Sequence, residues 1–281
     1  MTLTSEQLTA YTQDGYLHAR GTVSSAALRL ADTILQDWCE RQIDEWLQQG
    51  LIDDARQDLD FGHRLVQVWE TAGRPHYLRS PRRDLVGPAM YALLVEPSLL
   101  DLAADLLGTQ ELSVHGVFNA RPKLPDQKWT ETPWHQDAQY YRDAEAVHVL
   151  SIWFPLQAVE EHNSCLQVAP NGHEGQLFAD CQDEETGFKG IDRAEWHKLR
   201  GVSIEMERGD ALCFTQLTPH RALPNRGDAV RWSMDLRYEA TATATESGKK
   251  FGFVARSADA TRVVAEREWL AKWDELSIRT Y

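Results

Sequence analysis

The spacing of apolar residues changes near residue 108, and this change constrains the fold more than any other feature of the chain. Before it, apolar residues recur every three or four positions in Ser24–Gln49, the pattern of an amphipathic helix that ends near Gly50. A second such helix is expected between Pro97 and Gly108. After it come short runs rich in β-branched and aromatic residues, separated by turn-forming residues. These runs are ELSVHGVFNARP, AVHVLSIWFPL, SCLQVAP, VSIEME, ALCFTQL and AVRWSMDLRYE.

No helical pattern alternates with these short runs, which disfavours a parallel sheet built from βαβ units. An antiparallel jelly roll with helices packed outside fits the pattern better, so the predicted fold is mainly β with some α. We expect a single domain over residues 1–281, with a mostly helical wrap over 1–108, a barrel over 109–240 and a tail over 241–281. The tail is expected to contain a final helix, Val264–Leu276.

Local signals refine this outline. Thr4 and Gln7 have the spacing of a capping box, and Gly15 is expected to end the helix that they start. The Arg-Gly-Asp sequence at 208–210 predicts a hairpin turn between two strands. The polar stretch Cys181–Arg200 predicts an irregular insert between strands, and we expect a lid within 174–200.

Charge and cysteine content exclude several classes of partner and site. The chain has 29 basic and 43 acidic residues, a net charge of −14, which argues against a nucleic-acid or membrane partner. It has no apolar run long enough to span a bilayer and no signal-peptide pattern at its start. Four cysteines without a CxxC pair predict reduced thiols in a cytoplasmic protein, not a zinc ribbon. They are Cys39, Cys165, Cys181 and Cys213.

The sequence Trp134-His135-Gln136-Asp137 predicts a metal site. On a strand, residues i and i+2 point to the same face, so His135 and Asp137 are expected to converge on one ion. His220, directly after the run ALCFTQL, is the candidate third ligand. Two histidines and one carboxylate form the facial triad typical of non-haem Fe(II) enzymes that activate O₂. At this point a zinc hydrolase remains possible, because it uses the same ligand types.

Arg231, eleven residues after His220, favours the iron alternative. A hairpin return of that length brings Arg231 beside the metal ligand, where a guanidinium can hold a carboxylate through two hydrogen bonds. An iron site needs two electrons from a co-substrate to activate O₂. A 2-oxo dicarboxylic acid supplies them, since its keto-acid end chelates iron while its far carboxylate needs an arginine. Zinc hydrolysis has no such requirement.

These residues, with Trp153 and the stretch Asn163–His173 (NSCLQVAPNGH), resemble the phytanoyl-CoA dioxygenase family of Fe(II)/2-oxoglutarate oxygenases over residues 4–240. The resemblance implies a double-stranded β-helix (a cupin-like barrel) with iron at one mouth. It implies Fe(II), 2-oxoglutarate and O₂ as cofactors, and the metal ligands His135, Asp137 and His220. It implies that Arg231 binds the C5 carboxylate of 2-oxoglutarate. Because Asp137 supplies the carboxylate that halogenating relatives lack, halogenation is not expected.

The resemblance also implies further contacts to the co-substrate. Trp153 and Gln136 match family positions near it, and Asn119 is a candidate polar contact. Where the family often has a hydroxyl residue two positions after the distal histidine, this chain has Ala222, and Thr218 is the candidate replacement. The basic residues that bind CoA or co-substrate in relatives are matched only loosely, by Arg121 and Lys123.

Several nearby residues have competing interpretations. Trp134, Tyr140 and Tyr141 line a substrate pocket or pack the barrel rim. Arg237 lies an even number of residues after Arg231, so both are expected to point to the same face of the strand. Arg237 therefore either reaches the pocket or forms an ion pair with an acidic residue. The other histidines of the region are expected to be structural: His115, His148, His162 and His173.

The predicted function is oxidation, in the first place hydroxylation, of an unactivated C–H of a small organic substrate, with a tailoring step in specialised metabolism as the expected setting. Two alternatives stay open. One is a non-redox metalloenzyme, a hydrolase or isomerase on a cupin-like barrel with zinc or manganese, which needs neither Arg231 nor 2-oxoglutarate. The other is a silent binding barrel, which predicts a missing or misplaced ligand. The oligomeric state is not predicted.

Overall fold

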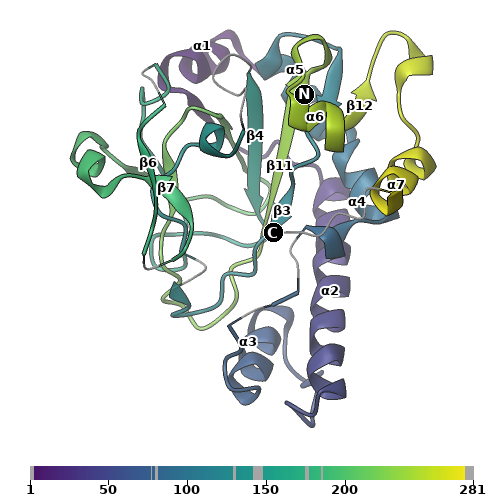
Figure 1. Cartoon of the computed structure of the whole chain (residues 1–281), viewed down its shortest axis with the longest axis vertical. Helices are drawn as coiled ribbons and strands as arrows, with labels where there is room; N and C mark the ends of the chain where they lie inside the picture. The colour runs from purple at the N-terminus through teal and green to yellow at the C-terminus, as the bar shows by residue number, and fades with distance from the viewer. Residues whose placement is uncertain are drawn as a thin grey trace.

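The structure is a computed structural model that describes residues 3–76, 78–79, 82–128, 131–141, 148–174, 177–184 and 186–275. It contains a seven-stranded and a three-stranded antiparallel sheet and a separate two-stranded hairpin. Figure 1 shows α2, α4 and α7 on one side of the central strands β4 and β11, and the hairpin β6–β7 on the other. The architecture is therefore mixed, with antiparallel sheets and a helical layer.

The helices begin and end at the signals that the sequence provides. Thr4 caps α1 in a capping box with Gln7, and Gly15 ends α1 in the left-handed region at φ 79°. Ser24 caps α2, and α5 begins at Pro97 and ends before Gly108, as predicted. The α-helices are α1 Ser5–Asp14, α2 Ser25–Gln48, α3 Phe61–Thr71, α4 Pro88–Leu94, α5 Pro97–Leu107, α6 Glu246–Phe251 and α7 Glu266–Glu275.

Short 3₁₀ helices connect these elements: η1 Arg83–Leu85, η3 Asp137–Tyr140, η4 Arg193–Lys198, η5 Thr241–Thr243 and η6 Ala260–Arg262. The predicted final helix is confirmed as α7, and Leu276, its predicted last residue, lies outside the described residues. Among the helices of the described ranges, none combines the length and apolar character needed to cross a membrane.

The large sheet has the order β1-β9-β4-β11-β2-β12, with β3 paired to β11. Its strands are β1 Tyr16–Ala19, β2 Leu112–Val114, β3 Asn119–Ala120, β4 Val149–Pro155, β9 Ala211–Thr215, β11 Ser233–Ala240 and β12 Phe253–Arg256. Its two edge strands, β1 and β12, come from the segments predicted as helical wrap and tail. The sheet thus takes strands from all three predicted segments of the chain.

The small sheet has the order β10-β5-β8, with strands β5 Leu166–Val168, β8 Val202–Ile204 and β10 His220–Ala222. The prediction of a hairpin at 208–210 was wrong, because β8 pairs with β5 whereas β9 pairs with β1 and β4. The turn, with Gly209 at φ 104°, carries the chain from one sheet to the other. The residues predict the turn itself, but the pairing of the strands beside it depends on distant strands.

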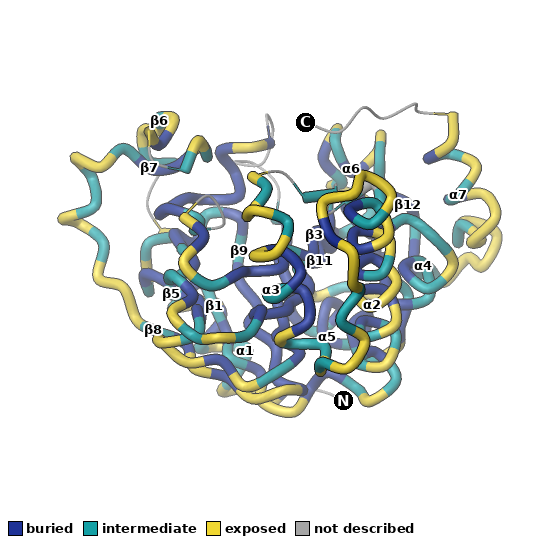
Figure 2. Tube along the Cα trace, turned by 90° about the horizontal axis from the view of Figure 1, so that it is seen from below, coloured by how far each residue is buried: buried dark blue, intermediate teal, exposed yellow. Residues whose placement is uncertain are grey.

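The two faces of the large sheet have different surroundings because side chains alternate along each strand. Met234 and Leu236 of β11, with Ile152 of β4, join the core that contains the buried residues of α2, α4 and α5. On the opposite face, Trp153 and Phe214 pack against residues of the small sheet in a second core. Figure 2 shows mostly buried chain in β9 and β11, at the centre of the molecule. The large sheet therefore has a helix-facing side and an interior side, and the interior side carries the site.

The insert at 181–200 is more ordered than predicted. It contains most of the hairpin β6 Asp180–Gln182 with β7 Lys189–Ile191, followed by η4. Asp183, 4% exposed, accepts hydrogen bonds from Thr186 and Arg193 across the hairpin loop. These contacts order a polar sequence that lacks the apolar alternation by which strands are recognised.

Candidate active site

Three buried side chains, His135, Asp137 and His220, converge at one end of the interior. One ligand atom from each of them lies within 4.8 Å of the others, so the three could hold a metal ion. His135 and His220 form an isolated antiparallel bridge, with backbone N–O distances of 3.0 and 2.9 Å in the two directions. The prediction that Asp137 lies on a strand was wrong, since it begins η3. Gln136 is extended, at φ −115° and ψ 134°, so His135 and Asp137 still face the same way.

Hydrogen bonds to backbone carbonyls fix both imidazole rings. Nδ1 of His135 lies 2.9 Å from the Pro133 carbonyl oxygen, and Nδ1 of His220 lies 3.0 Å from that of Thr218. Because a carbonyl only accepts, each Nδ1 carries the proton, and each Nε2 keeps its lone pair for a metal. Burial, together with the nearby His220, lowers the pKa of His135 to about 3, and burial also lowers the pKa of His220. Both rings are thus neutral ligands at physiological pH.

Arg237 of β11 and Ser151 of β4 hold the carboxylate of Asp137. Arg237 donates from Nη2 to Oδ1 at 2.9 Å and from Nε to Oδ2 at 3.1 Å, and the Ser151 hydroxyl donates to Oδ2 at 2.6 Å. Burial alone would raise the pKa of Asp137, but Arg237 and His220 outweigh it and hold that pKa below its ordinary value. Arg237 also contacts Asp235 at 3.0 Å. Of the two interpretations of Arg237, the structure selects the ion pair, and its partner is a residue of the triad.

Two buried cations lie further along the same interior face. Arg231 and Lys123 form an antiparallel bridge, and their exposed fractions are 4% and 1%. Arg231 donates to the Ser233 hydroxyl, and its guanidinium carbon lies 5.3 Å from the centre of the Trp153 ring. Within the described part of the chain, Nε of Arg231 and Nζ of Lys123 have no hydrogen-bond partner. Burial, then Arg231, lowers the pKa of Lys123 well below its ordinary value.

The remaining predicted pocket residues have defined partners. Asn119 lies on the interior face, where it donates to Asp235 at 3.4 Å and accepts from Arg82 at 3.3 Å. The Thr218 hydroxyl donates to the Gly15 carbonyl at 2.6 Å, so Thr218 supports the site through its own carbonyl, which binds His220. The Gln136 side chain donates to the Leu217 carbonyl at 2.7 Å and accepts from the Phe178 backbone at 2.8 Å.

The hairpin β6–β7 is fastened to the segment that carries His135 and Asp137. Ile191 donates its backbone N–H to the Trp134 carbonyl at 2.7 Å, and the Tyr140 hydroxyl donates to the Lys189 carbonyl at 2.6 Å. Trp134 packs with Ile191 and the partly buried Phe178. Tyr140 is 48% exposed, and its ring lies edge-on to His135 at 6.2 Å. Tyr141 is buried instead, against His115 at 4.6 Å.

With this geometry in place, comparison with known proteins assigns the family. A sequence model of phytanoyl-CoA dioxygenase (PhyH) matches residues 11–233, which is most of the chain. The chain belongs to the phytanoyl-CoA dioxygenase family. The predicted enzyme class, a 2-oxoglutarate-dependent non-haem iron dioxygenase, is thereby confirmed.

The curated proteins that resemble this chain differ in how much of their own length the similarity covers. The probable phytanoyl-CoA dioxygenase of Caenorhabditis elegans is 23% identical over 84% of this chain and 75% of that protein. Methylphosphonate hydroxylase of Gimesia maris is 27% identical over 86% of this chain and 82% of that protein. The human peroxisomal phytanoyl-CoA dioxygenase is 26% identical, but only over 50% of this chain and 43% of that enzyme.

The epimerase SnoN, in complex with Fe3+, alpha ketoglutarate and nogalamycin RO, shares the fold. It is 17% identical, covers 91% of this chain and 87% of its own, and superposes with a TM-score of 0.56. This member of the phytanoyl-CoA dioxygenase family offers two neutral imidazoles and one carboxylate on one side. That donor set fits the iron that enzymes of this class use. Among the described residues, Nε of Arg231 and Nζ of Lys123 have no hydrogen-bond partner, and these donors fit the far carboxylate of a dicarboxylate co-substrate.

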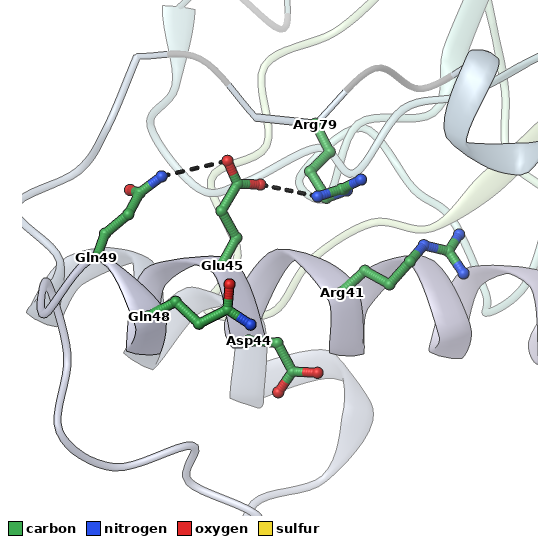
Figure 3. Close-up of a pocket in the computed structure, with 6 residues that line it drawn as sticks. All are labelled: Arg41, Asp44, Glu45, Gln48, Gln49 and Arg79. Carbon is green, nitrogen blue, oxygen red and sulfur yellow. Dashed lines mark hydrogen bonds and ion pairs between the residues drawn. The ribbon is translucent and has the colours of Figure 1, made fainter.

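A surface hollow along α2 is unrelated to this site (Figure 3). In it, Glu45 accepts from Arg79 at 2.9 Å and from Gln49 at 3.2 Å. The hollow is lined by charged and amide side chains: Arg41, Asp44, Glu45, Gln48, Gln49 and Arg79. Such an open, solvated groove lacks the apolar lining that small-molecule sites of enzymes have.

Proposed function

We propose that His135, Asp137 and His220 bind Fe(II), and that Arg231 and Lys123 together bind the C5 carboxylate of 2-oxoglutarate. The observation that carries this assignment is the pairing of two features on one interior face. A buried His–Asp–His set lies at one end. Further along this face lie the bridged pair Arg231 and Lys123, two buried cations that form no ion pair with a carboxylate among the described residues. A non-redox hydrolase has no use for the second feature.

The protein prepares the metal ligands before metal binds. Both histidines present an unprotonated Nε2, so no proton needs to leave. Arg237 and Ser151 keep Asp137 ionised and oriented, and their donors leave Asp137 to bind a metal through one oxygen. A set of two imidazoles and one carboxylate would hold the metal from one side, which would leave room for the co-substrate and O₂.

The co-substrate end is a cationic pocket with an aromatic wall. Arg231, over Trp153, offers its free Nε–H to a carboxylate, and Lys123 supplies a second positive charge beside it. Asn119 supplies a polar contact further along the same face. When bound, Fe(II) and 2-oxoglutarate would supply the activation of O₂ for the balanced reaction R–H + 2-oxoglutarate + O₂ → R–OH + succinate + CO₂. The protein holds the C–H of the substrate close to the metal and excludes water.

In this proposal the two sheets, which pack together through Trp153 and Phe214, form a jelly roll. The helices lie outside it, and the whole chain forms one domain. Gln136 links the metal-binding segment to Phe178, which directly precedes the hairpin β6–β7, and this hairpin forms the lid. The substrate is a small organic molecule of specialised metabolism, and no nucleic-acid or membrane partner is involved. A cytoplasmic location is supported by the four cysteines, which are all free thiols.

The test is oxygen-dependent formation of succinate from 2-oxoglutarate by the Fe(II)-loaded protein, which proceeds slowly even without substrate. We expect succinate from the wild type and none from Asp137→Ala. The non-redox alternative predicts metal binding without succinate, and that result would overturn the proposal.

A further inference from the structure

A third cation, Arg121, shares the interior face with Lys123 and Arg231. The pairs Asn119–Asp235 and Lys123–Arg231 lie in one continuous antiparallel register. Alternate residues of an extended segment point to the same side, so Arg121 lies on the same face as Asn119 and Lys123. The row that faces the site therefore carries three positive charges.

In the described part of the chain, the contacts of the Arg121 guanidinium are with neutral groups. Its Nη1 lies 3.5 Å from the Thr132 hydroxyl, and its guanidinium carbon lies 4.9 Å from the centre of the Phe188 ring. Among the residues that the structure describes, no carboxylate forms an ion pair with it. Arg237, by contrast, contacts both Asp137 and Asp235. Arg121 also adds to the effects that lower the pKa of Lys123 and of Arg231, as expected for neighbouring cations without counter-charges.

The co-substrate accounts for only part of this charge. Under the proposed function, the C5 carboxylate of 2-oxoglutarate brings one negative charge to Arg231 and Lys123, and its other end binds the metal. Arg121 keeps an unmatched charge, in a chain with a net charge of −14. Half-buried cations without a partner are costly, and an anionic ligand offsets that cost.

The position of Arg121 connects this charge to the lid. Phe188 lies in the loop of the hairpin β6–β7 and covers one face of the guanidinium. A stacked guanidinium keeps its edge N–H groups free, in the planar arrangement that matches an oxyanion. Thr132 is three residues before His135, which places Arg121 against the metal-binding segment.

We propose that Arg121 binds an oxyanion of the substrate, a carboxylate, phosphate or phosphonate, beneath the hairpin β6–β7. This inference rests on the proposed function and names its substrate class: a small organic anion whose reacting C–H lies between the anionic group and the metal. Phe188 closes over the same guanidinium, so that substrate binding and lid position are coupled.

The test uses the full chain, loaded without oxygen with Fe(II) and saturating 2-oxoglutarate so that the co-substrate site is filled. Inorganic phosphate, methylphosphonate and acetate are titrated separately, and calorimetry and tryptophan fluorescence report binding. We expect at least one probe to bind, and Arg121→Met to weaken it by about tenfold or more, the loss expected for one charge-assisted contact. Arg121→Lys restores part of the affinity, and 2-oxoglutarate binds all variants equally.

Arg221→Met is the matched control, because Arg221 is another half-buried arginine stacked on an aromatic ring, 4.9 Å from that of Trp134. It should leave probe affinity unchanged. Equal probe affinity in wild type and Arg121→Met, or no binding of any probe to wild type, overturns the inference. So does loss of 2-oxoglutarate affinity in Arg121→Met, which would assign Arg121 to the co-substrate. Failure of wild type to bind 2-oxoglutarate, seen before any probe is added, overturns the proposed function and this inference with it.

Discussion

Arg237 donates to both carboxylate oxygens of Asp137, at 2.9 and 3.1 Å, although the two residues are 100 positions apart in the chain. Both side chains are buried. Asp137 is thus held as an anion by a cation that is not one of the candidate metal ligands. Arg231 lies two residues before β11 in the same extended segment and has the same parity as Arg237, so both point to the interior face. The segment that carries the arginine proposed to bind the co-substrate therefore also orients Asp137.

Replacing Arg237 should harm both folding and metal binding. Arg237→Met leaves Asp137 as a buried carboxylate with only the Ser151 hydroxyl, so we expect the free energy of unfolding to fall by about 3 kcal/mol or more. Metal affinity should fall by about 10- to 100-fold, the usual effect of losing a residue that orients a ligand. Denaturant unfolding and Co(II) titration measure the two effects. Ser151→Ala, which removes one donor and no charge, should show a smaller loss of both, and equal losses would contradict this ranking.

Replacing Lys123 should have effects of opposite sign on stability and on binding. Lys123→Met removes a buried cation that has no partner, so the free protein should become more stable by about 1 kcal/mol or more. The same change should weaken 2-oxoglutarate binding by about tenfold, through loss of a charge-assisted contact. The exposed Lys128→Met is the control, with no expected change in either quantity. A less stable Lys123→Met with unchanged 2-oxoglutarate affinity would show that Lys123 is purely structural.

Metal-free protein should lose stability as the pH falls below about 6.5, because an unfolded histidine takes up a proton there. Burial lowers the pKa of His135 to about 3 in the folded chain, so the folded state stays unprotonated at this position. The free energy of unfolding then decreases on acidification, by about 1.4 kcal/mol per pH unit for one such histidine. Urea unfolding between pH 7 and about 5 measures this slope. His135→Gln should flatten it, and an unchanged slope would argue against a neutral buried His135.

Removing the Gln136 side chain should loosen the lid. Gln136→Ala deletes the hydrogen bond from the Phe178 backbone, which directly precedes the hairpin β6–β7, and the loss of one such bond at about 1 kcal/mol should raise amide exchange in the hairpin by about fivefold. Hydrogen exchange followed by mass spectrometry measures it. Gln182→Ala, on the hairpin itself with one exposed contact to Gly187, should change exchange little. Equal exchange in wild type and Gln136→Ala would mean that other contacts hold the lid.

Features encoded by neighbours in sequence were predictable. The capping box of Thr4 and the helix ends at Gly15 and Gly108 depend on residues within one turn, and the structure has them as predicted. The convergence of His135 and Asp137 follows from extended backbone at a single residue, Gln136. It therefore holds even though no regular strand forms there.

Features that depend on distant pairing were not predictable from spacing. The strand β1 lies in a segment predicted to be mostly helical. It forms a strand because it pairs with β9, almost two hundred residues later in the chain. The turn at Gly209 has hairpin chemistry, but the strands beside it have better partners elsewhere. The alternation of side chains along a strand predicts the face on which Arg237 lies. It does not predict its partner Asp137, because the two meet only when β11 pairs with β4.

The most direct test of the central claim is anaerobic titration of the metal-free protein with Fe(II) and 2-oxoglutarate, following the weak visible metal-to-ligand charge-transfer band. The account predicts a band in wild type, no band in His220→Ala, and a band in Arg231→Met only at much higher 2-oxoglutarate, about tenfold or more. Absence of the band in wild type at saturating Fe(II) and 2-oxoglutarate would contradict the account.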